Sequence, residues 1–188
     1  MLDTSNKSAF AYIIGVALGD GNLSNPNGRA VRLRITCDLK YPNIALEIQE
    51  KLHTVAPNNK ISISQKKGCI DISCYSNEWE KSLGWKVGSK LKQDISVPTW
   101  VQENPDYSKA CLKGLLQTDG SIYTDRGYLM VNFVSCSRLL AFDVLGMIES
   151  LGFQARMSTV SQKSTTKYTV RVARQTKDFI ETICLYKN

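Results

Sequence analysis

Two aspartates in this 188-residue chain stand in the same local pattern and have a side chain that binds divalent cations. Asp20 and Asp119 each follow an apolar stretch and precede a glycine. A carboxylate at the C-terminal end of a helix faces the negative end of the helix dipole, which disfavours its charge by about 0.3 to 1 kcal/mol. Two such carboxylates at short range also repel each other. A bound Mg²⁺, which prefers hard oxygen ligands, reverses both effects, so the pair predicts a metal site.

The segments around the two aspartates belong to an internal repeat. Residues 13–21 and 112–120 share apolar residues, a glycine at the third position and a final Asp-Gly, at an offset of 99 residues. The same offset relates five further pairs, which are Gly28 and Gly127, Cys37 and Cys136, Leu46 and Leu145, Glu50 and Glu149, and Leu52 and Leu151. One Asp-Gly pair is most simply a turn after a helix. Its repetition within two matching segments favours function and predicts two similar halves.

Each half shows the same predicted order of elements, αββαββα. An apolar helix ends at Asp-Gly, where we expect Gly21 and Gly120 as the C′ residues. The later elements are strands near 31–37 and 129–136, helices near 43–53 and 139–151, strand pairs 60–64 with 70–74 and 156–161 with 168–172, and short helices near 78–83 and 177–185. The predicted fold class is α+β. Its first repeat spans residues 1–85, a linker spans 86–108, and the second repeat spans 109–188.

Small residues predict how the halves meet. Gly15 and Gly19 lie one turn apart on one helix, and Gly114 and Thr118 hold the matching positions of the other. Small residues at this spacing let two helix backbones pack closely, so we expect the halves to share a core about a pseudo-twofold axis. This packing would bring both aspartates near the axis.

Composition limits the kinds of partner and chemistry. Lys and Arg total 24 against 17 acidic residues, and the net charge of +7 favours a polyanionic partner. The six cysteines form no C-x-x-C pair and His53 is the only histidine, which disfavours a zinc site or a histidine-based nucleophile. No run is long and apolar enough for a membrane span, and the start lacks a secretory signal. We expect a soluble protein in the cytoplasm, a mitochondrion or a plastid.

The paired segments resemble the motifs of the LAGLIDADG homing endonucleases, in their monomeric two-motif form. Lys90, the segment 97–101 and the segment 111–115 also resemble the inter-repeat region of intron- and intein-encoded members. The resemblance implies motif helices at the interface between repeats and a saddle of two antiparallel four-stranded sheets along the DNA major groove. It further implies a Mg²⁺-dependent enzyme, with Mn²⁺ or Ca²⁺ able to substitute in binding. Such an enzyme makes a staggered double-strand break across the minor groove of one long DNA site.

The resemblance also assigns the metal site. Asp20 and Asp119 would be the metal ligands, and the backbone carbonyls of Gly19 and Thr118 would assist. Bound magnesium ions would activate water and stabilise the charge on the phosphate and the leaving oxygen.

Other catalytic candidates are less sharply defined. Lys90 and Lys92 follow the last helix of the first half, where family members carry an active-site lysine, and Lys187 holds a comparable place in the second. Gln117 belongs either to the helix interface or beside the site. Family members often have Gln or Lys before the second helix, whereas this chain has Cys37-Asp38 and Cys136-Ser137. The groups that complete each active site are therefore left open.

The saddle face is predicted from alternation along the strands. In Val31–Ile35 the aliphatic residues share one face and the arginines share the other. Polar residues expected on the DNA side of the strands are Arg32, Arg34, Ser62, Ser64, Asp71, Ser73, Asn132, Thr169 and Arg171. Basic residues expected in loops that reach DNA are Arg29, Lys66, Lys67, Arg126, Lys163 and Lys167. Trp79, Trp85 and Trp100 are expected in the core.

Two other functions are compatible with the same fold. An RNA maturase would retain the motif helices for packing, with host intron RNA as its partner. A non-cleaving DNA-binding regulator would be expected to lose an acid, but both are present. The start at Met1, without a splicing-type Cys or Ser, favours a free-standing, intron-encoded enzyme. The preferred hypothesis is a monomeric endonuclease that binds double-stranded DNA without a membrane or an obligate protein partner.

Overall fold

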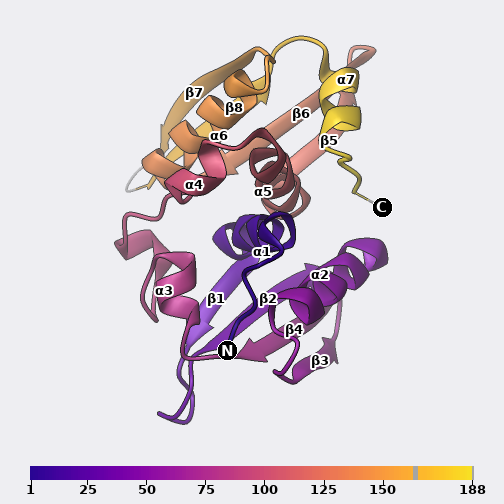
Figure 1. Ribbon diagram of the computed structural model, residues 1–188. Coiled ribbons are helices and arrows are strands. Elements are labelled where there is room, and N and C mark those ends of the chain that lie inside the picture. The colour runs from indigo at the N-terminus through magenta and orange to yellow at the C-terminus, as the bar shows by residue number, and fades with distance from the viewer. Residues whose placement is uncertain (163–164, 188) are drawn as a thin grey trace.

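The computed structural model describes residues 1–162 and 165–187, which form two α+β halves that meet along two helices (Figure 1). The first half contains α1 (Lys7–Asp20), β1 (Gly21–Ser24), β2 (Arg32–Asp38), α2 (Pro42–Val55), β3 (Ile61–Lys66), β4 (Cys69–Tyr75) and α3 (Trp79–Leu83). The second contains α5 (Pro105–Thr118), β5 (Gly120–Asp125), β6 (Tyr128–Ser135), α6 (Arg138–Ser150), β7 (Ala155–Gln162), β8 (Thr165–Val172) and α7 (Thr176–Thr182). The predicted order αββαββα is confirmed twice. The 3-10 turn η1 (Lys90–Lys92) and helix α4 (Thr99–Gln102) lie between the halves.

Each half is built on one antiparallel four-stranded sheet. The strand orders are β1-β2-β4-β3 and β5-β6-β8-β7, so the two sheets have the same topology. Helix α2 packs on the first sheet and α6 on the second. In β2 the aliphatic Leu33 and Ile35 are buried, whereas Arg32 and Arg34 lie on the opposite, partly exposed face, as the alternation predicts. The predicted α+β class and the two four-stranded sheets are therefore confirmed.

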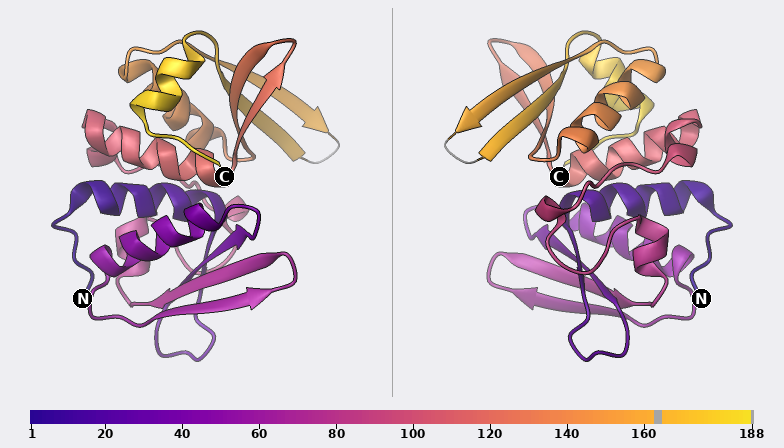
Figure 2. Two further views of the ribbon diagram at one scale, coloured as in Figure 1. Left: turned by 90° about the vertical axis from the view of Figure 1, so that its right-hand side faces the viewer. Right: turned by 90° about the vertical axis from the view of Figure 1, so that its left-hand side faces the viewer.

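Helices α1 and α5 lie side by side between the two halves (Figure 2). Every residue of α1 from Ala9 to Leu18 is buried, because the helix packs against its own half on one side and α5 on the other. A Cβ at Gly15 would overlap the backbone carbonyl of Cys111, and one at Gly114 would lie 2.6 Å from Tyr12 O. The predicted glycine-faced contact is confirmed. Neither α1 nor any other helix within the described ranges is long and apolar enough to cross a membrane.

The expected role of Gly21 and Gly120 as left-handed C′ residues is wrong. Gly21 has a φ of −75° and a ψ of 147°, and it begins strand β1 directly. Gly120 likewise begins β5. A side chain is excluded for a different reason, because a Cβ would overlap Ala17 O at Gly21 and Leu116 O at Gly120. The chain turns from helix into strand so sharply that only glycine clears the preceding helical turn.

Local capping fixes several boundaries. Helix α5 begins at Pro105, inside the expected linker 86–108, because the Asn104 side chain accepts hydrogen bonds from the amides of Asp106 and Tyr107. Helix α6 ends before Gly152, whose φ of +86° confirms the predicted stop.

The expected placement of the tryptophans in the core also agrees with the structure. Trp79 and Trp85 are buried. Trp100 is partly buried and stacks on Phe10 at a centroid distance of 5.9 Å.

Candidate active site and nucleic-acid interface

The close packing of α1 and α5 brings the two Asp-Gly ends together. A Cβ at Gly19 would overlap the Thr118 side chain and lie 3.5 Å from Asp119 Oδ2. Gly19 and Thr118 are the residues that precede the two aspartates, so each helix end contacts the other at the predicted positions. The first half thus supplies Asp20 and the second supplies Asp119 to one region on the pseudo-twofold axis.

Two cavities open beside these helix ends, and each contains residues from both halves. The larger, of about 540 Å³, is lined by Asp119, Gly19 and Lys90, together with the segment 134–139. The smaller, of about 240 Å³, is lined by Asp20, Thr118 and Lys187, together with Cys37, Asp38 and Tyr41. Each aspartate therefore shares a cavity with a lysine and with the residue that precedes the other aspartate.

The two lysines bind the carbonyl ends of the motif helices. Lys90 Nζ donates hydrogen bonds to Ala17 O at 3.1 Å, to Leu18 O at 2.8 Å and to Gly19 O. Lys187 Nζ donates to Thr118 O at 3.1 Å and to Gly120 O at 2.6 Å. A cation at a helix C-terminus stabilises the carbonyls that have no partner within the helix. The carbonyls of Gly19 and Thr118, which we expected to assist a metal, thus accept bonds from lysine in this structure.

The charges of the two aspartates and the two lysines influence one another. Burial raises the pKa of Asp119 to about 6, and the nearby Asp20 carboxylate adds to this rise while Lys90 and Lys187 oppose it. Burial also raises the pKa of Asp20, against the opposing effect of the two lysines. Both aspartates contact solvent through their cavities, yet the surrounding protein removes enough water to disfavour their charge. The arrangement favours an added cation.

The pKa values of the two lysines are lowered instead. Burial lowers the pKa of Lys90 to about 8, although Asp119 and Asp20 act to raise it. Burial lowers the pKa of Lys187 as well, again against the two carboxylates. A lysine with a pKa near 8 holds a proton that it can release close to neutral pH, which is a property of groups at functional sites.

The site does not include every candidate from the sequence. Lys92 is exposed and lines neither cavity. Gln117 lines the Asp20 cavity, but its side chain is buried in the helix interface, where its Oε1 accepts a hydrogen bond from Tyr12 at 2.7 Å. Lys187 fills the place opposite Lys90. It lies 97 residues after Lys90 rather than 99, so the repeat offset does not find it.

The residues that depart from the family pattern line the two cavities. Cys37 and Asp38 lie beside Asp20, and Cys136 and Ser137 line the Asp119 cavity. Burial and the Asp20 and Asp71 carboxylates raise the pKa of Cys37 to about 12, so this thiol stays neutral. The two cavities therefore differ in the groups around similar acid and lysine pairs.

The polar face of the first sheet carries the expected residues. Arg34 lies between Asn22 on β1 and Ser73 on β4, and Ser73 faces Ser62 on β3. In the next row Asp71 faces Thr36 and Ser64, but it is only 6% exposed. Its carboxylate accepts hydrogen bonds from Thr36 and Lys66, which hold its pKa below the usual range. Asp71 thus orients Lys66 on this face, and its own oxygens are occupied.

The second sheet shows the same division of faces. Val170 and Val172 are buried, so Thr169 and Arg171 lie on the opposite face as expected. Asn132 is on that face too, because it pairs with Arg171 across the strands, and its Oδ1 accepts a 3.0 Å hydrogen bond from Arg171 Nε. Arg156 on β7 stands directly opposite Arg171. The sequence analysis did not single out Arg156, although the alternation of Arg156 with the partly buried Met157 is the signal for it.

The basic residues expected in loops divide into three groups. Arg29, Lys67 and Arg126 are exposed in connections between strands, as expected. Lys66 and Lys167 lie instead within β3 and β8, because both hairpins extend further than the alternation indicates. Lys163 lies outside the described residues.

Comparisons with known proteins agree with this architecture. A family model described as a LAGLIDADG-like domain matches residues 106–184, and one described as a WhiA LAGLIDADG-like domain matches residues 9–73. The tRNA-splicing ligase RtcB of Pyrococcus furiosus is 25% identical to this chain, in an alignment that covers 86% of this chain and 19% of that protein. The chain therefore spans about a fifth of the length of this relative.

Solved structures resemble the whole chain. A complex of a point variant of I-DmoI, which is a homing endonuclease, with its target DNA in the presence of Mg gives a TM-score of 0.69 at 18% identity, covering 97% of this chain and 98% of that one. Full-length WhiA from Thermatoga maritima gives a TM-score of 0.66 at 12% identity, covering 99% and 58%. One LAGLIDADG-like segment in each half, together with the resemblance to these solved structures, shows that the chain has the LAGLIDADG fold in its two-repeat, pseudo-symmetric form.

Proposed function

We propose that this protein is a site-specific DNA endonuclease that uses a divalent cation to cut both strands of one long duplex site. The observation that carries the proposal is the pair of cavities on the pseudo-twofold axis. Each combines an aspartate of one half with the residue that precedes the aspartate of the other half, and with a lysine, which is Lys90 between the halves or Lys187 of the second half. Two similar sites on one axis match the two antiparallel strands of a DNA duplex.

The residues present fit a divalent cation. Asp20 and Asp119 supply hard oxygen ligands, and burial disfavours the charge of both when no cation is bound, while the Asp20 carboxylate further disfavours that of Asp119. Within residues 1–162 and 165–187, no cluster of three or more His, Cys, Asp or Glu side chains could hold a metal. Mg²⁺ is commonly held by one or two carboxylates together with waters and substrate phosphates, so two acids suffice. When bound, the metal supplies an activated water and neutralises charge on the phosphate.

The two lysines would bind the substrate phosphate, and one of them can also exchange a proton. The Lys90 and Lys187 ammonium groups lie beside the acids, where they would attract and orient a phosphodiester. With a pKa of about 8, Lys90 can also hold or release a proton at its Nζ near neutral pH. No histidine takes this role, since the only one, His53, is exposed on α2.

The two polar sheet faces are proposed to bind the DNA. Arg34 lies on the inner strand β2 of the first sheet, and Arg171 lies on the inner strand β8 of the second, opposite Arg156 on the edge strand β7. Arg156 and Arg171 are like charges directly opposite each other, an arrangement that is unfavourable unless an anion lies between them. Phosphates of a duplex would relieve this repulsion, and the net charge of +7 would attract them from a distance. We further propose that the protein acts as a monomer, because both sites lie in one chain.

The test is cleavage of a randomised duplex library in Mg²⁺ by the wild type and by Asp20→Asn/Asp119→Asn. We expect the wild type to enrich one long site cut on both strands. The double variant should bind this site without cutting it. If the double variant cuts as well as the wild type, these acids are not the metal ligands. If neither protein cuts any duplex, the endonuclease proposal is wrong.

A non-cleaving DNA-binding protein is the second candidate. The first half matches a WhiA LAGLIDADG-like domain, and the fold of full-length WhiA resembles 99% of this chain. Tight binding of one duplex by both proteins without cleavage would support it, whereas tight binding of structured intron RNA would indicate a maturase. The RtcB match covers 19% of that protein, so no ligase activity is proposed.

A further inference from the structure

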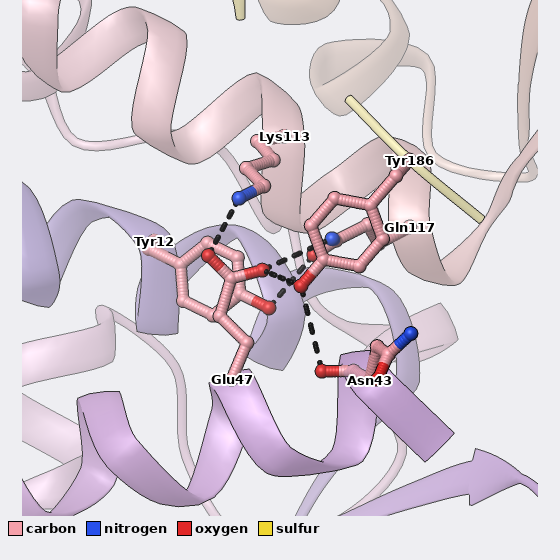
Figure 3. A network of polar contacts seen from close by, with 6 residues as sticks. All are labelled: Tyr12, Asn43, Glu47, Lys113, Gln117 and Tyr186. Atoms are coloured by element: carbon pink, nitrogen blue, oxygen red, sulfur yellow. Dashed lines mark hydrogen bonds and ion pairs between the residues drawn. The ribbon is translucent and has the colours of Figure 1, made fainter. Parts of the chain in front are cut away.

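A buried polar network joins the two halves beside the Asp20 cavity (Figure 3). At its centre is Glu47 of α2, whose carboxylate accepts hydrogen bonds from Lys113 Nζ at 2.6 Å, Tyr186 OH at 2.6 Å and Gln117 Nε2 at 3.2 Å. Gln117 also accepts the bond from Tyr12 of α1. The network thus connects α1 and α2 with α5 and the segment after α7. The proposed reaction uses none of Glu47, Lys113 or Tyr186.

The Glu47 carboxylate is held as a charged acceptor. Its side chain is 15% exposed, and that of Lys113 is 14% exposed. Burial opposes ionisation of Glu47, but the hydrogen bonds from Lys113, Tyr186 and Gln117 outweigh it and keep its pKa below the usual value. A buried carboxylate with three donors is costly to move, because any displacement leaves polar groups without partners. Glu47 is therefore a fixed point to which the other chain segments are attached.

One of those segments carries the active-site lysine of the smaller cavity. Tyr186 immediately precedes Lys187, whose ammonium binds the carbonyls of Thr118 and Gly120 and lies 5.6 Å from the centroid of the Tyr41 ring. The phenol of Tyr186 is bound to Glu47 in the opposite half. Two successive side chains of this segment thus reach across the interface, and the first limits where the second can lie.

The chain segment that follows the other lysine is held by a different carboxylate. At the repeat offset of 99, Glu47 corresponds to Gly146, which has no side chain. On this side Asp143 of α6 accepts hydrogen bonds from Ser96 Oγ at 2.7 Å and from the Val97 amide at 2.8 Å, in the segment that follows Lys90. Each lysine-bearing segment is therefore fixed to the middle helix of the opposite half, through separate anchors.

We propose that Glu47 is a positioning residue that, through Tyr186, holds Lys187 in the Asp20 cavity independently of Lys90. Where it concerns cleavage, the inference rests on the proposed function. Loss of the Glu47–Tyr186 contact would then slow one of the two strand cuts. Glu47 touches neither cavity's acid in any hydrogen bond of the described residues, so its effect would act through Tyr186 and Lys187.

The experiment measures the two strand cuts separately on a duplex with a different fluorophore on each strand. Lys187→Met identifies the strand that Lys187 serves. We expect Tyr186→Phe and Glu47→Gln to slow the same strand by about tenfold, the size expected for losing one hydrogen bond to a charged group. The other strand should be cut at the wild-type rate, so nicked DNA accumulates. Asp143→Asn is the matched control, and it should leave the Lys187 strand unchanged.

Amine labelling provides a readout that does not need cleavage. Acetylation of each lysine in the DNA-free protein is followed by peptide mass spectrometry. Tyr186→Phe should increase the labelling of Lys187 and leave that of Lys90 unchanged. This variant retains the Lys113–Glu47 ion pair, so it stays informative if Glu47→Gln does not fold.

The inference is overturned if Tyr186→Phe slows both strands equally, or if Lys187 labelling does not change. A wild type that cuts no DNA would refute the proposed function instead. In that case the labelling result alone would decide whether Glu47 anchors Lys187.

Discussion

Lys187 binds the carbonyl end of α5 as Lys90 binds that of α1, although the two lysines come from segments of different structure. Lys90 lies on the 3-10 turn between the halves, whereas Lys187 follows the last helix. Each lies in a cavity with one aspartate. The two motif helices thus end in equivalent acid and lysine pairs, of which the repeat offset of 99 relates the acids but not the lysines.

This equivalence predicts that each lysine serves one strand. Lys90→Met and Lys187→Met should each slow the cutting of a different strand by about a hundredfold, because each removes a preorganised cation from one site. The double variant should lose both cuts. Strand-resolved rates on a single duplex measure this. If both single variants slow the same strand, the pairing of one lysine with one site is wrong.

The pKa of Asp119 predicts how stability depends on pH without a metal. In the folded protein this pKa is raised to about 6 from 3.8, so the folded state binds the proton more tightly than the unfolded state. Stability from this group is therefore highest in acid and is lost as the pH rises from about 4 through about 6. Asp119→Asn should raise the Tm of the metal-free protein at neutral pH, and this advantage should disappear in acid. Because Asp119 contacts solvent, we expect a gain of about 1 kcal/mol or less.

Magnesium should then stabilise the two proteins to different extents. It should raise the Tm of the wild type at neutral pH by binding only the folded state, but it should have a much smaller effect on Asp119→Asn. Thermal scans with and without Mg²⁺ provide the measurement. Equal stabilisation of both proteins would argue against Asp119 as a metal ligand.

The surroundings of two helical glycines predict opposite effects on stability when each is replaced by alanine. Gly15→Ala places a Cβ against the backbone of Cys111, which cannot move without shifting α5, so we expect a loss of about 3 kcal/mol in the free energy of unfolding. Gly146→Ala, within α6, meets no atom within 4 Å and should stabilise the protein by about 0.5 to 1 kcal/mol through helix propensity. Urea unfolding of the two variants compares them directly. A neutral result for Gly15→Ala would mean that α1 and α5 pack less closely.

The polar sheet faces predict which arginines bind DNA. Arg34→Ala and Arg171→Ala should each weaken binding of the target duplex. If the contact is to a phosphate, each should also reduce the slope of log K against log salt by about 0.9. Lys81→Ala changes an exposed lysine on α3, outside both sheets, and is the matched control. Binding titrations at several salt concentrations distinguish the variants. Wild-type affinity in both arginine variants would exclude these faces as the DNA surface.

The repeat, the order of elements and the two candidate acids could all be predicted from the amino-acid sequence. These features depend on local patterns, because alternation fixes strand faces, apolar stretches fix helices, and an ungapped offset of 99 residues relates Asp20 to Asp119. Strand lengths were predicted less well, and Lys66 and Lys167 lie in strands rather than loops. Hairpin length is decided by cross-strand hydrogen bonds, which a single-strand pattern does not contain.

Which residues meet at the candidate site became clear from the folded structure. Lys90 lines the Asp119 cavity, whereas Lys92 lines neither cavity. Lys187 lines the Asp20 cavity, and Gln117 belongs to a buried network with Glu47. The folded structure also showed that Gly21 is required by the nearness of the preceding helical turn and not by a left-handed backbone. These outcomes depend on distances between segments far apart in the chain, which are set by how closely α1 and α5 pack. Local sequence patterns specify the elements, but the contacts between halves arise only when the shared core forms.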